Sequence, residues 1–292
     1  MTPEQLKKLF SNLNTWKRGG ERAPHKPLLL LYALGRTNKE KPRLFSFVEN
    51  KDQLKELLHE FGPPRFTSPN YPFIRLQNDG IWDVSSNKTL DSKKDWSDKV
   101  LLENKTFGGF SEEVHSLLLG HKNLAKELAI LLLEKNFPES LHRDILNSVG
   151  LDLESPILTR DRNFRDRILR AYEYSCAVCG FNVRLRHTLV AVEAAHIKWH
   201  QAGGPDIENN GIALCSMHHK LFDRGVFTIT SSMEFRVAEM AHGTHGFNEW
   251  LMNYHGRRIR NPINPEYEPS EDNIGWHVRE VFRGPERYSP QC

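Results

Sequence analysis

Hydrophobic side chains recur at intervals of three and four residues through most of the first half of the chain. This period places them on one face of a helix. Pro27 suits the first turn of such a helix, and Gly62 with Pro63 would end another. The pattern therefore predicts helices over residues 6–13, 27–36, 54–61, 111–120, 122–137 and 139–150.

Residues 71–85, "YPFIRLQNDGIWDVS", have a different pattern, in which polar and apolar positions alternate. Asn78, Asp79 and Gly80 lie in the middle of the segment, and Asn and Gly tolerate positive φ. Alternation on both sides of such a turn is typical of two paired strands. This segment therefore predicts a β-hairpin.

The second half begins with an amphipathic, arginine-rich segment over residues 160–175, in which Phe164, Ile168 and Tyr172 share one helical face. The pattern then predicts a strand over 187–197, a Gly- and Pro-rich loop over 200–211, a strand over 212–215 and a helix over 216–225. Polar residues with Gly150 and Pro156 interrupt the periodicity near 151–160. We expect two domains, residues 1–153 and 154–292, and a helical extension over 231–292.

Composition agrees with a globular protein of this kind. The chain has 292 residues, of which 38% are hydrophobic and 26% charged. Its N-terminus is polar, and the longest aliphatic run, "LLLLYAL" over 28–34, is too short to cross a bilayer. We expect an unprocessed, cytoplasmic protein.

The net charge is only +3, so the overall charge does not indicate a polyanionic partner. Basic residues are nevertheless concentrated: seven arginines lie between 160 and 186, and "GRRIR" over 256–260 adds three. They can be solvated helix faces, partly neutralised by neighbouring acids, or phosphate contacts. Charge alone leaves both interpretations open.

The cysteines are spaced for metal binding. Cys176 and Cys179 form one CxxC pair, and Cys215 with His218 repeats the spacing. Three thiolates and an imidazole make a closed tetrahedral zinc site that would stabilise the fold without taking part in chemistry. The alternative is three buried cysteines and an unrelated histidine. Cys292, the last residue, has no such partner in the pattern.

A second group of polar residues surrounds this site. His196 ends a predicted strand, Asn210 ends the Gly-rich loop, and His219 lies four residues before Asp223 on the predicted helix. Residues four apart share a helical face, so His219 and Asp223 would bind one cation together, on the side that faces His196.

The segment "EAAHIKWHQAGGPDIENNGIALCSMHHKLFDRG", residues 193–225, resembles the HNH nuclease motif with its ββα-metal fold, in the version found in restriction endonucleases. The resemblance implies that His196 is the general base and that His219 and Asp223 hold Mg²⁺ or Mn²⁺ at the scissile phosphate. Asn210 would order the loop between the strands. Many family members carry a metal ligand directly before the base, where this chain has Ala195; the third ligand would then be Glu193 or His200.

The first half is similar to the sulfur-binding domain of phosphorothioation-dependent restriction endonucleases. The similarity lies in "RAPHKPLLLLYALGR" over 22–36, "YPFIRLQNDGIWDV" over 71–84 and "FPESLHRDIL" over 137–146, and "WHVREVFRGPERY" over 276–288 is similar to the same group. Sulfur is larger and less hydrated than oxygen. A domain that recognises a phosphorothioate therefore needs an apolar pocket for the sulfur, here called the cup, beside cations for the phosphate oxygens, here called the rim. The candidates are Tyr71, Pro72 and Phe73 for the cup, and His25, Lys26 and Arg75 for the rim.

Structural roles remain possible for the same residues. Tyr71 and Phe73 would then be core residues, Pro72 the start of a strand, and the segment 25–27 the entry to a helix.

The sequence thus predicts an α+β protein: a mostly helical DNA-reading domain with a β-hairpin, followed by a zinc-containing HNH nuclease domain. The expected function is that of a type IV, modification-dependent restriction endonuclease acting on double-stranded DNA, as a monomer or a homodimer. Two alternatives remain. One is an HNH nuclease that reads another modification or a plain sequence. The other is a catalytically inactive, zinc-stabilised DNA-binding module, which Ala195 makes conceivable.

Overall fold

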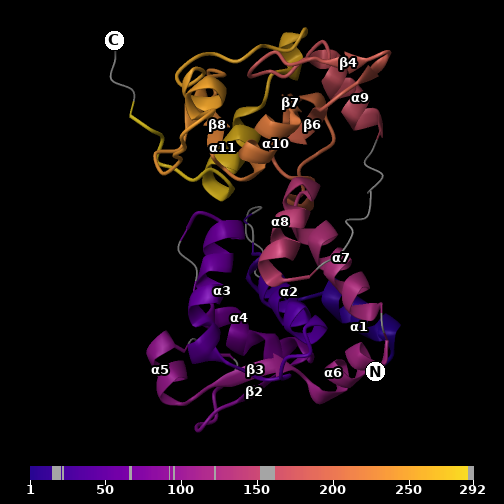
Figure 1. Cartoon of the computed structure of the whole chain (residues 1–292), viewed down its shortest axis with the longest axis vertical. Helices are drawn as coiled ribbons and strands as arrows, with labels where there is room; N and C mark the ends of the chain where they lie inside the picture. Colours follow the sequence, from indigo (N-terminus) through magenta and orange to yellow (C-terminus); the bar gives the residue numbers. More distant parts are fainter. Residues whose placement is uncertain are drawn as a thin grey trace. The chain divides into compact units, whose positions relative to one another are not determined.

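A computed structural model describes residues 1–14, 21, 23–65, 68–91, 93–94, 96–121, 123–151 and 162–288 (Figure 1). The chain forms two compact units, Met1–Pro156 and Ile157–Cys292. Most of the segment 151–160, where the sequence predicts a boundary, lies outside the described residues, as does Cys292. Helices and short sheets occur together, which confirms the predicted α+β class.

The first unit is mainly helical. Each helix predicted in the first half is present, and α4 and α5 are additional. α2 is the central helix: its residues from Lys26 to Gly35 are buried, and it packs against α3, α4, α7 and α8. The helices are α1 (Pro3–Ser11), α2 (His25–Asn38), α3 (Phe47–Phe61), α4 (Asn70–Arg75), α5 (Asp98–Glu103), α6 (Glu112–Gly120), α7 (Leu124–Asn136) and α8 (Glu139–Val149).

The hairpin predicted over residues 71–85 is wrong. Asn70–Arg75 forms α4, Leu76–Asp79 continues it as a 3₁₀ turn, and Gly80, with φ of 73°, ends that turn. Positive φ at glycine therefore caps a helix here. Phe73, Ile74 and Leu76 are all buried, a spacing that fits one face of a helix better than the alternation of a strand.

The strand that follows, β2 (Trp82–Ser85), pairs with a distant segment. β1 (Phe45–Ser46), β3 (Phe107–Phe110) and β2 form an antiparallel sheet in the order β1-β3-β2. Trp82 lies opposite Phe110 in this sheet. The local pattern carries no signal for such a pairing, because the partner strand begins more than twenty residues later.

The second unit contains a β-β-α arrangement. β6 (Val192–His196) and β7 (Gly211–Cys215) pair antiparallel, with His196 opposite Gly211. α10 (Ser216–Asp223) continues directly from β7, and α9 (Arg162–Ala171) packs on both strands. Two two-residue strands, β4 (Arg184–Leu185) and β5 (Thr188–Leu189), precede β6. The expected order of strand, loop, strand and helix is therefore present.

The C-terminal segment is helical only in part. β8 (Phe227–Ile229) pairs with β9 (Phe235–Val237), a single π-helical turn covers Asn248–Met252, and α11 covers Glu271–Glu280. The segment folds back onto the end of α10, because a Cβ added to Gly225 would lie 2.1 Å from the Val281 carbonyl oxygen. The predicted helical extension is thus correct only for α11.

Among the described residues, no helix combines the length and the apolar character needed to span a bilayer.

Candidate metal centres and nucleic-acid interface

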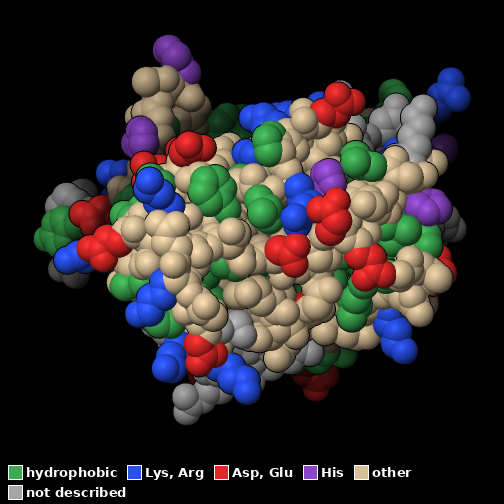
Figure 2. Space-filling model, turned by 90° about the horizontal axis from the view of Figure 1, so that it is seen from below, with side chains coloured by type: hydrophobic (Ala, Val, Ile, Leu, Met, Phe, Trp, Pro, Cys, Tyr) green, Lys and Arg blue, Asp and Glu red, His purple; other side chains and the backbone are tan. Residues whose placement is uncertain are grey.

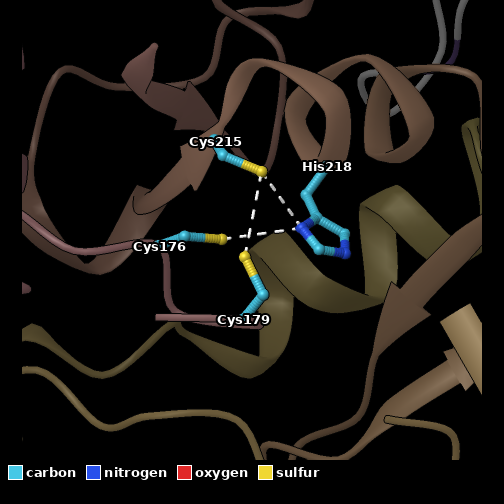
Figure 3. A group of neighbouring side chains, drawn as sticks. All are labelled: Cys176, Cys179, Cys215 and His218. Carbon is cyan, nitrogen blue, oxygen red and sulfur yellow. Dashed lines mark hydrogen bonds between the residues drawn. The ribbon is translucent and has the colours of Figure 1, made fainter. Parts of the chain in front are cut away.

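Cys176, Cys179, Cys215 and His218 converge in the second unit (Figure 3). The Nδ1 atom of His218 lies 3.2 Å from Cys215 Sγ and 3.7 Å from Cys176 Sγ. On the other side of the ring, Nε2 donates to the carbonyl of Trp250 at 2.9 Å. This bond orients the ring so that Nδ1 faces the thiols. The C-terminal segment therefore orients the imidazole of this cluster.

The protonation states of Cys176 and His218 are those of a site where a metal ion can replace protons. Hydrogen bonds from Cys179 and Cys215 hold the pKa of Cys176 well below its usual range, despite burial. Burial opposes a charge on His218, but its hydrogen bonds to Cys176 and Cys179 raise the pKa of His218 to about 10. A thiolate beside an imidazolium is a site where a metal ion can take the place of protons. Three sulfurs and one nitrogen are the donors of a structural metal site.

His219 is the centre of a separate group. Its side chain is buried between two carboxylates: Nδ1 lies 2.6 Å from Glu193 Oε2, and Nε2 lies 3.2 Å from Asp223 Oδ2. Ser216 donates to the second oxygen of Glu193 at 2.8 Å. Trp199 donates from Nε1 to the second oxygen of Asp223 at 3.1 Å. Strand β6, the loop after it and helix α10 each contribute to this group.

The carboxylates determine the charge of His219. Burial opposes the imidazolium, but the negative charge of Asp223 and the hydrogen bonds to Asp223 and Glu193 raise the pKa of His219 to about 9. The two carboxylates contact opposite nitrogens of the ring, so an ion on the Nδ1 side would have His219 and Glu193 as its donors. A set of nitrogen and oxygen donors suits Mg²⁺ or Mn²⁺ better than a thiol cluster does. The two groups of residues therefore differ in the ion that each would hold.

His196 lies at the end of β6. Its Nε2 atom is 2.7 Å from Asp206 Oδ1, and its ring stacks on Phe164 with centroids 4.0 Å apart. The exposed His200 approaches the same carboxylate oxygen at 3.5 Å. His196, His200 and Asp206 lie close enough together to hold a metal ion. Of the two candidate third ligands, Glu193 contacts His219, whereas His200 contacts Asp206 and His196.

Asn210 is fully buried and ties the loop after β6 together. Its Oδ1 accepts from the Lys198 amide at 2.9 Å, and its Nδ2 donates to the carbonyls of Lys198 and Pro205 at 3.0 and 2.9 Å. Gly204 makes this close packing possible, because a Cβ there would lie 1.8 Å from the Lys198 oxygen. Asn210 therefore fixes the backbone just beyond His196.

Helix α4 carries the residues expected to contact sulfur. Tyr71 is 44% exposed, and the guanidinium of Arg75 lies 5.8 Å from the centre of its ring. Pro72 is buried. Phe73 is fully buried, with its ring 5.1 Å from that of Phe47 and edge to face with it. Phe73 thus belongs to the core, and Tyr71 is the exposed ring of the three residues.

Two of the expected rim cations lie at the start of α2. The ammonium of Lys26 is buried and lies 2.5 Å from Asp79 Oδ2 and 2.7 Å from the Asn14 carbonyl oxygen. Its charge therefore joins α2 to the turn after α4 inside the unit. His25 is half-buried.

The basic residues of α9 are partly structural. Arg167 donates from Nη2 to the Asp206 carbonyl at 2.6 Å and pairs from Nε with Glu208 at 2.9 Å. The position of Arg160 and the side chain of Arg162 lie outside the described residues. On the face drawn in Figure 2, Lys and Arg side chains lie among Asp and Glu side chains, so charges of both signs are mixed there.

Comparisons with known proteins found one family match in each half of the chain. Residues 3–154 match the family described as "ScoMcrA-like, DNA sulfur-binding domain", and residues 176–230 match "HNH endonuclease". No curated protein matches the chain.

Among solved structures, the chain is similar to the "Sulfur binding domain of SprMcrA complexed with phosphorothioated DNA", with 21% identity over 52% of this chain and 95% of that chain and a TM-score of 0.45. The corresponding ScoMcrA domain has 24% identity over 50% and 94% of the two chains, with a TM-score of 0.43. The type IV phosphorothioation-dependent restriction endonuclease ScoMcrA has 24% identity over 50% of this chain and 27% of that chain, with a TM-score of 0.42.

Both family resemblances predicted from the sequence are confirmed, and the second unit contains an HNH endonuclease domain. The sulfur-binding match spans more than half of the 292 residues. The chain therefore belongs to the family of proteins with a ScoMcrA-like DNA sulfur-binding domain.

Proposed function

We propose that the chain is a modification-dependent restriction endonuclease. Residues 1–153 bind phosphorothioated double-stranded DNA, and residues 154–292 hydrolyse nearby phosphodiester bonds at a one-metal HNH site. One observation carries the proposal: β6 ends in His196, and the same strand and α10 hold His219 between Glu193 and Asp223. A base and an oxygen-rich cation site are the parts that metal-assisted hydrolysis requires.

The catalytic ion, Mg²⁺ or Mn²⁺, would be held by His219 and Glu193. Asp223, expected from the sequence to be a direct ligand, is 2% exposed at its side chain, whereas Glu193 is 39% exposed. The Nδ1 side of His219 is thus the side that solvent reaches. Asp223 accepts from Nε2 and orients the ring, as carboxylates behind metal-bound histidines do. When bound, the ion neutralises charge on the phosphate and on the leaving oxygen.

His196 is the general base of this proposal and takes the proton of the attacking water. Asn210 acts on the backbone: it holds the Lys198 and Pro205 segments together and so keeps the end of β6 in place. Without a fixed strand end, the base would not hold its position relative to the phosphate.

Zinc is the proposed occupant of the Cys176, Cys179, Cys215 and His218 cluster. It would join the segment after α9 to the start of α10, with the Trp250 carbonyl holding the imidazole from the C-terminal segment. Because these four donors complete a tetrahedron, this ion would serve stability.

Sulfur recognition is assigned to α4. Tyr71 offers an exposed aromatic surface for the poorly hydrated sulfur, and Arg75 beside it offers a cation for the phosphate oxygens. Pro72 and Phe73 would shape this surface from beneath, and His25 would complete the cationic rim. Lys26 would contribute indirectly, through its ion pair with Asp79 in the turn after α4.

One active site per chain cuts one strand at a time. We propose that two chains act together on a duplex, and we place the activity in the cytoplasm, the compartment that holds the DNA of a prokaryotic cell. Analytical ultracentrifugation on modified duplex would show two chains per DNA; one chain per DNA with complete double-strand cutting would contradict the dimer.

The proposed function is tested with two duplexes of identical sequence, one of which bears a phosphorothioate. Cutting confined to the modified duplex in Mg²⁺ or Mn²⁺, and lost in His196→Ala, would support both halves of the proposal. Equal cutting of both duplexes would leave the nuclease and discard the sulfur reader. No cutting of either, across flanking sequences and metals, would favour a DNA-binding module.

A further inference from the structure

Asp206 lies in the loop between β6 and β7 and contacts the proposed base directly. Its Oδ1 atom is 2.7 Å from Nε2 of His196, a short distance for a hydrogen bond to a carboxylate. Neither the spacing of the two histidines and Asn210 nor the zinc cluster assigns a role to this residue.

The loop holds Asp206 from both sides. Arg167 donates to the Asp206 carbonyl at 2.6 Å, and the same guanidinium pairs with Glu208 at 2.9 Å. Asn210 donates to the carbonyl of Pro205, the preceding residue, at 2.9 Å. The backbone that presents the carboxylate is therefore anchored to α9 and to the base of the loop.

The ring of His196 is held in a second direction by Phe164. The two rings stack with an interplanar angle of 13° and centroids 4.0 Å apart. Gly211, opposite His196 in the sheet, leaves room for this arrangement, because a Cβ there would lie 3.0 Å from the Phe164 ring and 2.2 Å from Ile168. The stack fixes the plane of the imidazole, and the hydrogen bond fixes its rotation within that plane.

A carboxylate can only accept a hydrogen bond, so the Asp206 contact places a proton on Nε2 of His196. In the neutral ring, the lone pair is then on Nδ1. After the ring accepts a proton at Nδ1, the negative charge of Asp206 stabilises the imidazolium.

We propose that Asp206 is a positioning residue for the nuclease reaction: it selects the tautomer of His196 in which Nδ1 is the basic nitrogen and holds the ring in place. The inference rests on the proposed function, in which His196 is the general base.

The competing role for these residues is a cation site made by His196, His200 and Asp206, whose donor atoms lie within 4.8 Å of one another. In that case a metal ion would occupy the position of the Nε2 proton. His200 also supplies a matched control, because it approaches the same carboxylate oxygen but is largely exposed.

The first test is ¹⁵N spectroscopy of histidine-labelled full-length chain, with the His196 signal identified by its loss in His196→Ala. We expect the wild-type ring to be protonated on Nε2, Asp206→Ala to give a mixture of tautomers, and His200→Ala to leave the wild-type pattern. Two results would overturn the inference: an unchanged tautomer in Asp206→Ala, or loss of the Nε2 proton in the wild type when Mg²⁺, Mn²⁺ or Zn²⁺ is added.

The second test is kinetic, on the duplex that the wild type cuts. Asp206→Ala should lower kcat about 100-fold, the lower end of general-base contributions, with KM for DNA unchanged. Asp206→Glu, which keeps the carboxylate, should recover part of kcat, and His242→Ala, at an exposed histidine of the same unit, should stay within about twofold of wild type. Wild-type kcat in Asp206→Ala would overturn the inference while leaving the nuclease proposal intact. A wild-type chain that cuts no duplex would instead overturn the proposed function, and the tautomer would still report on Asp206.

Discussion

The indole of Trp199 donates a hydrogen bond to Asp223 Oδ1 at 3.1 Å, and the other oxygen of this carboxylate lies 3.2 Å from His219 Nε2. Trp199 thus holds the residue that orients His219, although no metal-binding pattern in the sequence includes a tryptophan. Both Trp199 and Asp223 are almost completely buried.

Trp199→Phe should destabilise the second unit by about 1–3 kcal/mol, because a buried carboxylate oxygen loses its donor. It should also weaken Mn²⁺ binding, because His219 loses an oriented partner. Chemical denaturation and Mn²⁺ titration measure the two effects. Tyr288→Phe, at a largely exposed ring of the same unit, is the control and should change neither quantity. Wild-type stability and affinity in Trp199→Phe would show that the hydrogen bond has no such role.

Glu193→Gln should lower the affinity for Mn²⁺ at least about tenfold, because it removes the solvent-side carboxylate beside His219. Bound zinc should remain unchanged, since Glu193 is outside the cysteine cluster. Isothermal titration measures the first quantity and elemental analysis the second. Glu266→Gln, at an exposed carboxylate, serves as the matched control. Unaltered Mn²⁺ affinity would remove Glu193 from the site.

Cys179→Ser should abolish zinc binding and unfold the second unit at a lower temperature, because the proposed ion would link distant segments of that unit. The first unit contains none of these ligands, so its thermal transition should be preserved. Calorimetry of the full chain and zinc analysis provide the readouts. Cys292→Ser is the matched thiol control. Retention of one zinc per chain in Cys179→Ser would refute the assigned ligand set.

Tyr71→Ala should reduce the preference for phosphorothioated over unmodified duplex at least about tenfold, equivalent to about 1.4 kcal/mol. The loss should come from the modified duplex, because the aromatic surface is proposed to contact sulfur. Competition binding with the two duplexes measures the ratio. Tyr288→Ala removes another exposed tyrosine, from the second unit, and should preserve the preference. An equal loss of affinity for both duplexes would assign Tyr71 to general DNA contact.

His142 in α8 should make stability depend on pH. Burial lowers the pKa of His142 below its ordinary value of 6.5, so the unfolded chain binds this proton more readily than the folded chain. The contribution of His142 to the free energy of unfolding is therefore fully present above about pH 6.5. It is lost as the pH falls through the lower pKa that His142 has in the folded chain. Between about pH 7 and pH 5, the wild type should lose more unfolding free energy than His142→Gln. Equal losses in denaturant titrations would contradict this.

Local patterns were sufficient for most helices of the first unit, although not for α4 and α5, and for the spacing of the candidate metal-binding residues. The members of each pair are only three or four residues apart: Cys176 with Cys179 in a CxxC pair, and His219 with Asp223 on one helical turn. At such short separations, the spacing along the chain determines the distance in space. The family resemblances extend this local information, because each consists of quoted segments with fixed spacing.

Contacts between distant segments could not be predicted in this way. The strand β2 pairs with β3 instead of forming a hairpin, Lys26 pairs internally with Asp79, and Phe73 enters an aromatic core. In each case the sequence supplied a residue that can form the contact, whether a strand residue, a cation or an aromatic ring. Its partner was chosen by packing among segments far apart along the chain.

The sequence by itself determined which side chains can bind metal, accept protons or contact DNA, because these properties belong to residue types and short spacings. Only the tertiary structure decided which of them lie in contact: Glu193 beside His219, Trp199 behind Asp223, and Asp206 beside His196. The physical reason is that hydrogen bonds and ion coordination act over about 2–4 Å, and only the folded backbone brings groups from separate segments within that range.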